Sequence, residues 1–324
     1  MKNTLRILGM ILSGGMFFTS TTFGQQLPQF SQYVFNNLQV NPGYAGYKGQ
    51  AFVQSTYRSQ WVTFPGAPKT FSVVADLSAK EGLMGFGFSL VSDQIGPTGT
   101  TTAMLTYAYR IRIGQESFLS LGVSGGASEY VLDGDLLMPG DADDPDLPQG
   151  RTNIFTPNMN AGLFFNSNRF FAGFSTFNMV GKKALEREDI ALAYHSFHFF
   201  LTAGALIPLS ENVQFKPSFL IKEVKGIPTN YDLNTMFLFM ERLWIGASYR
   251  SNLKMKEENL QGNLNQRKAI AFLTEIFATE KLRIGYAYDH NLSEINNYRD
   301  NSHEFSLGFF ISPKKGFPTN GKWF

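Results

Sequence analysis

The sequence predicts an all-β protein, an up-and-down transmembrane β-barrel of about 14 antiparallel strands with an irregular N-terminal segment packed at or in the lumen. Two patterns predict it: large apolar residues alternate with small or polar ones, and short connections alternate with long ones. The composition agrees, because 32 Phe and 13 Tyr accompany only 17% charged residues, where soluble domains have about 25%. We therefore expect a surface that faces lipid.

Residues 1–24 have the pattern of a secretory signal peptide. Lys2 and Arg6 precede a short apolar run, and small and polar residues follow it up to Gly24. A membrane anchor is the weaker alternative, because the apolar run is too short to span a bilayer as a helix. We expect cleavage before Gln25 and export through the inner membrane.

Residues 25–50 fit neither a periodic helix nor a periodic strand. The aromatic residues from Phe30 onward have mixed spacing, and residues 41–43 read Asn-Pro-Gly, which is turn chemistry. An aromatic but irregular segment must bury its rings against another part of the protein. In a barrel, that part is the lumen or its rim, so we expect a plug-like segment here.

Residues 51–312 contain the strands of the expected barrel. Residues 84–90 and 282–289 alternate apolar residues with glycine, serine or charged residues. In a soluble sandwich the apolar face would be the core, whereas in an outer-membrane barrel it faces lipid and the polar face lines the lumen. Strands are expected to begin near residues 51, 69, 82, 98, 116, 153, 169, 195, 212, 228, 242, 267, 280 and 302.

The connections between these strands alternate in length. Short turns are expected near residues 80, 115, 168, 211, 241 and 280. Longer loops are expected around residues 59–69, 131–152, 179–193, 251–266 and 291–301. Short periplasmic turns and longer external loops, on an even number of strands, are typical of membrane barrels. Residues 313–324 form a C-terminal tail rich in Pro, Gly and Lys.

Five expected strands share a glycine flanked by apolar residues. These glycines are Gly85, Gly122, Gly173, Gly246 and Gly285. They can mark places where a plug or a neighbouring strand approaches the wall closely. Alternatively, they relieve crowding inside a tapering barrel.

Several motifs, in order along the chain, resemble the PorP/SprF family, outer-membrane proteins of type IX secretion and gliding in Bacteroidetes-type bacteria. The N-terminal segment carries PQFSQY at residues 28–33 and NPGYAG at residues 41–46, with Gly43 where the family usually has Ala. The other motifs are YRSQW at 57–61, GAPKT at 66–70, DQIGPT at 93–98, KPSFLIKEVKG at 216–226, WIGASYR at 244–250 and LRIGYAYD at 282–289.

The resemblance implies a non-enzymatic, integral outer-membrane component of type IX secretion. Its implied partners are periplasmic ring or lipoprotein subunits, a large secreted surface adhesin, or both, together with the lipid bilayer. We expect partner or plug contacts at Gln29, Phe30, Tyr33, Asn41, Pro42, Tyr44, Gly46, Arg58 and Trp61. For Arg58 and Trp61 the alternative is an interfacial arginine and an aromatic-girdle tryptophan.

Two other functions remain open. One is a channel for small hydrophobic substrates, like the FadL fatty-acid transporters, with the N-terminal segment as its plug. The other is an outer-membrane hydrolase, for which Asp289, His290 and nearby Ser293 are the candidate group. No nucleophile elbow accompanies them, so we expect no enzyme and no cofactor. The mature chain would carry 26 basic and 26 acidic residues, since the signal holds two of the 28 basic ones, which argues against nucleic acid.

Metal binding has one weak candidate, the acidic loop with Asp141, Asp143, Asp144 and Asp146. Calcium prefers six to eight oxygen ligands, but the sequence lacks an EF-type loop, and a solvated external loop is the alternative. His195 and His198 are three residues apart, which places them on opposite faces of a strand. They are therefore not expected to share a metal.

Overall fold

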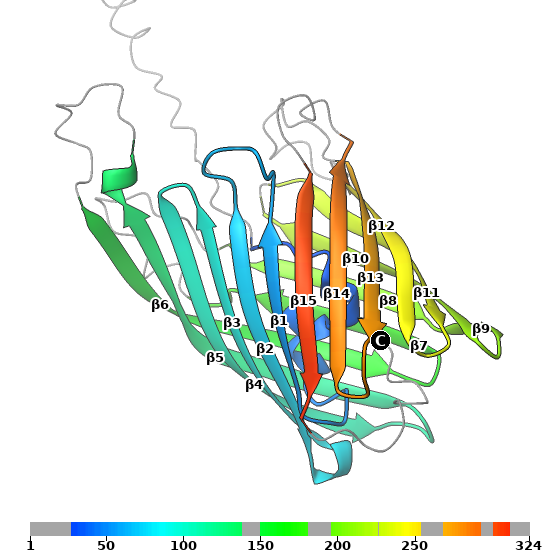
Figure 1. Ribbon diagram of the computed structural model, residues 1–324. Coiled ribbons are helices and arrows are strands. Elements are labelled where there is room, and N and C mark those ends of the chain that lie inside the picture. Colours follow the sequence, from blue (N-terminus) through cyan, green and yellow to red (C-terminus); the bar gives the residue numbers. More distant parts are fainter. Residues whose placement is uncertain are drawn as a thin grey trace, which may run out of the picture.

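The computed structural model describes residues 27–137, 150–180, 196–225, 227–253, 268–292 and 301–311. They form a closed antiparallel β-barrel (Figure 1), so the expected fold class is confirmed. The strands in order are β1 Phe52–Ser59, β2 Lys69–Ala79, β3 Met84–Ile95, β4 Thr98–Arg112, β5 Phe118–Asp133, β6 Arg151–Asn166, β7 Phe170–Phe177, β8 His198–Ala205, β9 Ile207–Ser210, β10 Val213–Val224, β11 Thr229–Phe239, β12 Leu243–Leu253, β13 Ala269–Phe277, β14 Leu282–Asn291 and β15 Ser302–Phe310.

The wall has 14 spans, because β8 and β9 are two parts of one strand. Both pair with β10 in continuous register across Leu206, with Gly204 opposite Ser218 and Ile207 opposite Phe215. All expected strand starts lie within three residues of the observed ones. The wall closes where β1 pairs with β15, from Phe52 opposite Phe310 onward. Among the described strands, this closure leaves none of the 14 spans at the edge of the sheet.

The two faces of the wall differ as the alternation predicts. On β4, Leu105 points outward and is 70% exposed, whereas Met104 and Thr106 point into the lumen and are buried. Successive side chains of a strand point to opposite faces. The outward set of large residues, which includes Phe155 and Phe305, therefore forms the apolar belt of a transmembrane barrel.

One end of the barrel has tight turns. The β2–β3 turn contains Lys80 and Glu81 with φ of 48° and 56°, and the β11–β12 turn contains Met240 and Glu241 with φ of 50° and 54°. Two consecutive residues with positive φ form a two-residue turn whose twist matches that of the flanking strands.

Within the part of the chain that the structure describes, no helix is long and apolar enough to cross a membrane.

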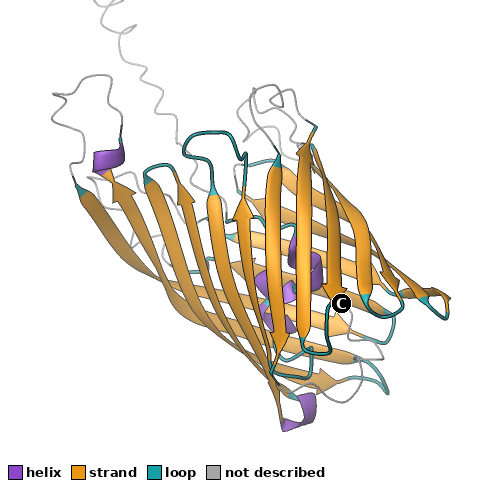
Figure 2. Ribbon diagram, viewed as in Figure 1, coloured by secondary structure: helices purple, strands orange, loops and turns teal. Residues whose placement is uncertain are grey.

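Three 3₁₀ turns lie inside the barrel (Figure 2): η1 Gln32–Phe35, η2 Asn37–Gln39 and η3 Pro42–Tyr44. Two further ones, η4 Lys80–Gly82 and η5 Gly134–Leu136, lie in connections between strands. Asn36 and Asn41 begin η2 and η3, and their side chains accept hydrogen bonds from the N–H groups of Leu38 and Gly43. Such local capping explains why the segment folds into short turns rather than a strand.

Candidate functional site: the plug in the lumen

Residues 27–50, here called the plug, fill the lumen. From Phe30 to Gln50, all residues except Gln39 and Gly49 are buried. Tyr44 is completely buried, and its ring and that of Tyr47 meet Phe164 of β6 edge-on, with centroids 5.3 and 5.5 Å apart. The aromatic residues that fit no periodic pattern therefore pack against the inner wall.

Glycines of the wall lie where the plug comes closest. A Cβ on Gly85 would collide with the carbonyl of Ala45, and one on Gly122 with the backbone of Pro42 and Gly43. Gly173 approaches the side chain of plug residue Asn41 in the same way, Gly285 approaches that of Gln32, and a further glycine, Gly162, also approaches Asn41. Four of the five glycines in the sequence repeat thus support close approach of a plug. The exception is Gly246, whose Cβ would meet Thr235 and Met236 of the neighbouring strand β11.

Arg58 fastens the start of the plug through two carboxylates. Its guanidinium lies 2.5 Å from an oxygen of Asp289 and 3.0 Å from one of Glu304. Glu304 accepts hydrogen bonds from the backbone N–H groups of Ser31 and Gln32 at 2.8 and 3.0 Å, and Asp289 accepts one from the Ser31 hydroxyl at 2.7 Å. Hydrogen bonds to ionised groups are stronger than neutral ones. Arg58 therefore positions the carboxylates that hold the plug.

A second arginine extends this cluster. Arg250 binds both oxygens of Asp232 at 2.9 and 3.0 Å and lies 3.8 Å from Asp289. Next to it, Asn234 donates a hydrogen bond to the Tyr33 hydroxyl at 2.9 Å. Burial raises the pKa of Tyr33 well above its usual value, so this hydroxyl stays protonated.

Buried lysines bind carbonyl groups of the plug. Lys216 donates to the Val34 carbonyl at 2.8 Å, and Lys222 donates to the Leu27 carbonyl at 3.3 Å. Within the plug, Lys48 donates to the Phe35 carbonyl at 3.1 Å. Burial, with the nearby charge of Arg283 adding to it, lowers the pKa of Lys48 to about 7. These contacts satisfy buried backbone groups that would otherwise lack partners.

The second half of the plug is held by three further side chains, one acidic, one amide and one hydroxyl. Asp76 of β2 accepts a hydrogen bond from the Gly46 N–H at 2.5 Å. Asn41 donates to the Leu163 carbonyl at 2.8 Å, and the Ser175 hydroxyl donates to the Val40 carbonyl. The plug is therefore fastened along its whole length.

The residues singled out from the sequence fall into two groups. Phe30, Tyr33, Asn41, Pro42, Tyr44 and Gly46 are buried in the plug, Gln29 is half-buried at its start, and Arg58 is buried beneath it. Trp61 is different, because it lies half-buried in the β1–β2 loop with φ 48°, where its N–H donates to the Ser302 hydroxyl. The structure brings Arg58 and the plug together and places Trp61 apart, in the loop. Their partner role stays a prediction.

Sequence reasoning missed the charged residues that hold the plug: Asp76, Glu304, Lys216 and Lys222. Each occupies an inward position of a strand and has at least one apolar neighbour in the chain. A charge at such a position was the available signal, because it needs a buried partner.

The metal and hydrolase candidates gain no geometric support. Asp141, Asp143, Asp144, Asp146, His195 and Ser293 lie outside the described residues. The ring of His198 accepts a hydrogen bond from the Leu27 N–H at 3.3 Å, and Asp289 is engaged by Arg58. Among the described residues, no three His, Asp or Glu side chains gather as potential metal ligands.

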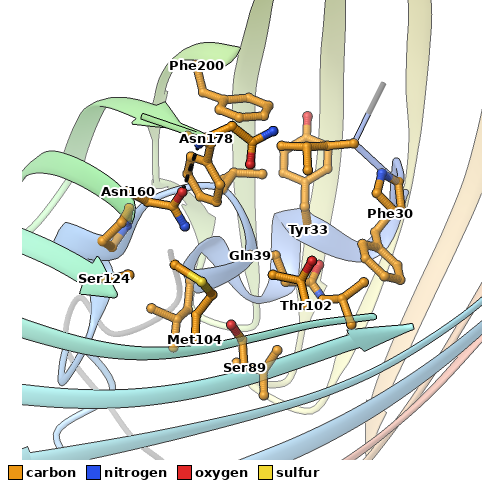
Figure 3. A pocket seen from close by; sticks show the side chains of 18 of the residues that line it. Phe30, Tyr33, Gln39, Ser89, Thr102, Met104, Ser124, Asn160, Asn178 and Phe200 are labelled. Atoms are coloured by element: carbon orange, nitrogen blue, oxygen red, sulfur yellow. Dashed lines mark hydrogen bonds between the residues drawn. The ribbon is translucent and has the colours of Figure 1, made fainter. Parts of the chain in front are cut away.

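A cavity of about 150 Å³ lies between the plug and the wall (Figure 3), and its lining includes Asp93 of β3 and Thr100 of β4. Plug residues Phe30, Tyr33 and Gln39 line one side of it, and Met104 and Asn160 are among the wall residues on the other. Its lining is mostly neutral and combines rings with amide and hydroxyl groups.

The family model of the type IX secretion system membrane protein PorP/SprF matches residues 22–309. A comparison with curated protein sequences gives no significant match. Among solved structures, the CymD monoaromatic hydrocarbon channel is 9% identical with a TM-score of 0.50, covering 90% of this chain and 94% of its own. A Pseudomonas aeruginosa FadL homologue is 11% identical with a TM-score of 0.48, covering 88% of this chain and 95% of its own. At 9% identity, the resemblance to CymD shows the barrel fold alone.

Proposed function

The chain belongs to the PorP/SprF family of type IX secretion system membrane proteins, and we propose that it serves type IX secretion and gliding as a non-enzymatic, plugged outer-membrane barrel. Its partners are periplasmic ring or lipoprotein subunits, a large secreted surface adhesin that it helps to secrete and anchor, or both. It needs no cofactor. Residues 1–24 are its cleaved signal peptide, 25–50 its plug, 51–312 its barrel and 313–324 its tail.

The observation that carries this proposal is the plug and its attachment. Charged side chains from β1, β2, β10, β14 and β15 bind backbone or side-chain groups of the plug. A lumen filled in this way makes the barrel a rigid mount. Partner specificity then resides in the connections at the two ends, which can vary without unpairing strands.

The alternative is a FadL-like channel for small hydrophobic substrates, and it calls for a continuous apolar path. The lumen is instead filled by the plug and lined by ion pairs such as Arg58–Asp289 and Arg250–Asp232. Burying charges costs free energy unless they are paired and hydrogen-bonded. This lining favours a structural lumen over an apolar conduit.

The experiment is a pull-down of the tagged protein from its own outer membrane in a gentle detergent, with mass spectrometry of the bound proteins. Recovery of periplasmic ring or lipoprotein subunits, or of one giant surface protein, would support the proposal and show which kind of partner the barrel binds. A monomer without partners after crosslinking, together with uptake of small hydrophobic molecules, would favour the channel.

A further inference from the structure

We propose that the short-turn mouth of the barrel contains a binding site for an extended peptide segment of a periplasmic partner protein. The site is a cavity of about 540 Å³, within the range of roughly 300–1,000 Å³ found for ligand sites. The placement of this mouth on the periplasmic side rests on the proposed function.

Three turns and the end of the plug enclose this cavity. The β2–β3 turn contributes residues 78–83, the β4–β5 connection contributes residues 115, 116 and 118, and the end of β6 with the turn that follows contributes residues 166–168. Plug residues Tyr47 and Gly49 also line it. An occupant would therefore touch the plug and the wall together.

Arg110 supplies a buried donor to this cavity. It lies on β4, its Nε donates to the Ser120 hydroxyl at 3.3 Å, and its guanidinium lies 5.6 Å from the ring centre of Tyr47. Within the described part of the chain, its Nη2 is buried and has no hydrogen-bond partner. A buried donor left unpaired costs about 1–3 kcal/mol, or more when charged.

Asn166, the last residue of β6, supplies a buried acceptor. Its side chain is 8% exposed, and its Oδ1 has no hydrogen-bond partner among the described residues. It stands opposite Phe118 in the β5–β6 register, while Arg110 stands opposite Ser120 on the other side of β5. The two unpaired groups thus lie on β4 and β6, the strands on either side of β5, at the same end of the barrel.

A peptide backbone matches this pair of groups. Each peptide unit offers a carbonyl that can accept from Arg110 and an N–H that can donate to Asn166. The charges around the cavity are mixed, since Lys80 and Arg110 are accompanied by Glu81 and Glu116, and Glu116 accepts from Asn168. This balance favours a neutral backbone over an anion such as phosphate, and the rings of Tyr47 and Phe118 can flank its side chains.

The test uses the full-length protein in detergent and short overlapping synthetic peptides that cover the periplasmic subunits of the secretion system. We expect peptides that bind the unmodified protein to bind Arg110→Met and Asn166→Leu at least about tenfold more weakly. Arg242→Gln is the matched control, because Arg242 lies at the same end in the β11–β12 turn, outside the cavity. Its affinity should be unchanged.

Heat-modifiable gel migration checks that each variant is folded, and Arg110→Lys, which keeps a cationic donor, should restore part of the binding. The proposal is overturned if no peptide binds the unmodified protein, or if folded variants bind as tightly as it does. If secretion requires the chain but tolerates both substitutions, the cavity is not a partner-binding site, and the proposed function stands. If peptide binding depends on Arg110 but loss of the chain has no effect on secretion, the binding site stands and the proposed function is refuted.

Discussion

Gly122 and Gly125 lie on the same strand, β5, but face opposite sides of the wall. A Cβ on Gly122 would collide with the backbone of Pro42 and Gly43, whereas a Cβ on Gly125 would meet nothing within 4 Å. We expect Gly122→Ala to destabilise the plugged state by about 1–3 kcal/mol, because the lumen cannot accept an added methyl group without backbone movement. The temperature at which the folded gel band converts to the unfolded band measures this.

Gly125→Ala is the control for strand propensity, since it adds the same methyl group on the outer face of the same strand. We expect it to leave the conversion temperature unchanged or slightly raised. Equal behaviour of the two variants would contradict close approach of the plug to the wall at Gly122.

Arg58 is 3% exposed and neutralises two carboxylates that hold the plug. Removing one partner of a buried ion pair costs roughly 3–5 kcal/mol, because the other charge is left uncompensated. We therefore expect Arg58→Met to lower the unfolding midpoint in denaturant strongly. Arg112→Met is the control, because Arg112 is exposed and its guanidinium bonds carbonyls of its own turn.

The second variant that isolates the charge effect is Arg58→Met combined with Glu304→Gln. The amide removes one uncompensated charge, and its single carbonyl oxygen can still accept one of the two hydrogen bonds that the Ser31 and Gln32 N–H groups donate to Glu304. Partial recovery of the midpoint is expected. No recovery would mean that Arg58 acts through packing rather than through its charge.

The plug and the wall are separable elements. Each strand of the wall pairs with its two neighbours, and closure is made by β1 and β15 without any plug residue. Deleting residues 29–46 should therefore leave a barrel that assembles and migrates as a heat-modifiable band, with water replacing the plug around the lumenal charges. We also expect a higher conductance in planar bilayers and loss of partner function.

The intact barrel with residues 29–46 present is the reference for both measurements. Heat-modifiable migration of the deleted form with unchanged secretion of the partner would refute the partner role of the plug. Failure to assemble would refute the independence of the wall.

The elements could be predicted from the sequence to very different degrees. Strands such as β3 and β14 can be predicted from their period-two alternation. Apolar residues face lipid at every second position, and small or polar residues face the lumen at the positions between them. The attachment of the plug could not be predicted, because pairs such as Ser31 and Glu304 are 273 residues apart and meet only after the barrel closes. Arg58 was found through its motif, whereas Asp76 lies outside the family motifs, and Lys216 begins the motif KPSFLIKEVKG without any sign in the sequence that it contacts the plug.

At the scale of the whole molecule, the barrel inverts the polarity of a soluble protein. Its outer face carries large apolar residues such as Leu105, Phe155 and Phe305 at 55–70% exposure, and its interior holds a network of buried charges. The inner network replaces the hydrophobic core only in part, since plug rings and wall rings pack between the ion pairs. The outer belt therefore places the barrel in the bilayer, and the interior contacts hold the plug against the wall.

The outer belt makes a depth-dependent prediction. Leu105 lies at the middle of β4 and is 70% exposed, so lipid should surround it. An arginine on the lipid face costs about 2–4 kcal/mol at the bilayer midplane and about 0–1 kcal/mol near the interfaces. Leu105→Arg should thus lower the free energy of unfolding in lipid vesicles by about 2–4 kcal/mol. Glu129→Arg, on the outer face of β5 opposite Thr101, should change it little, because that position lies near the long-loop end and already carries a charge. Equal costs at the two positions would place the belt elsewhere on the barrel.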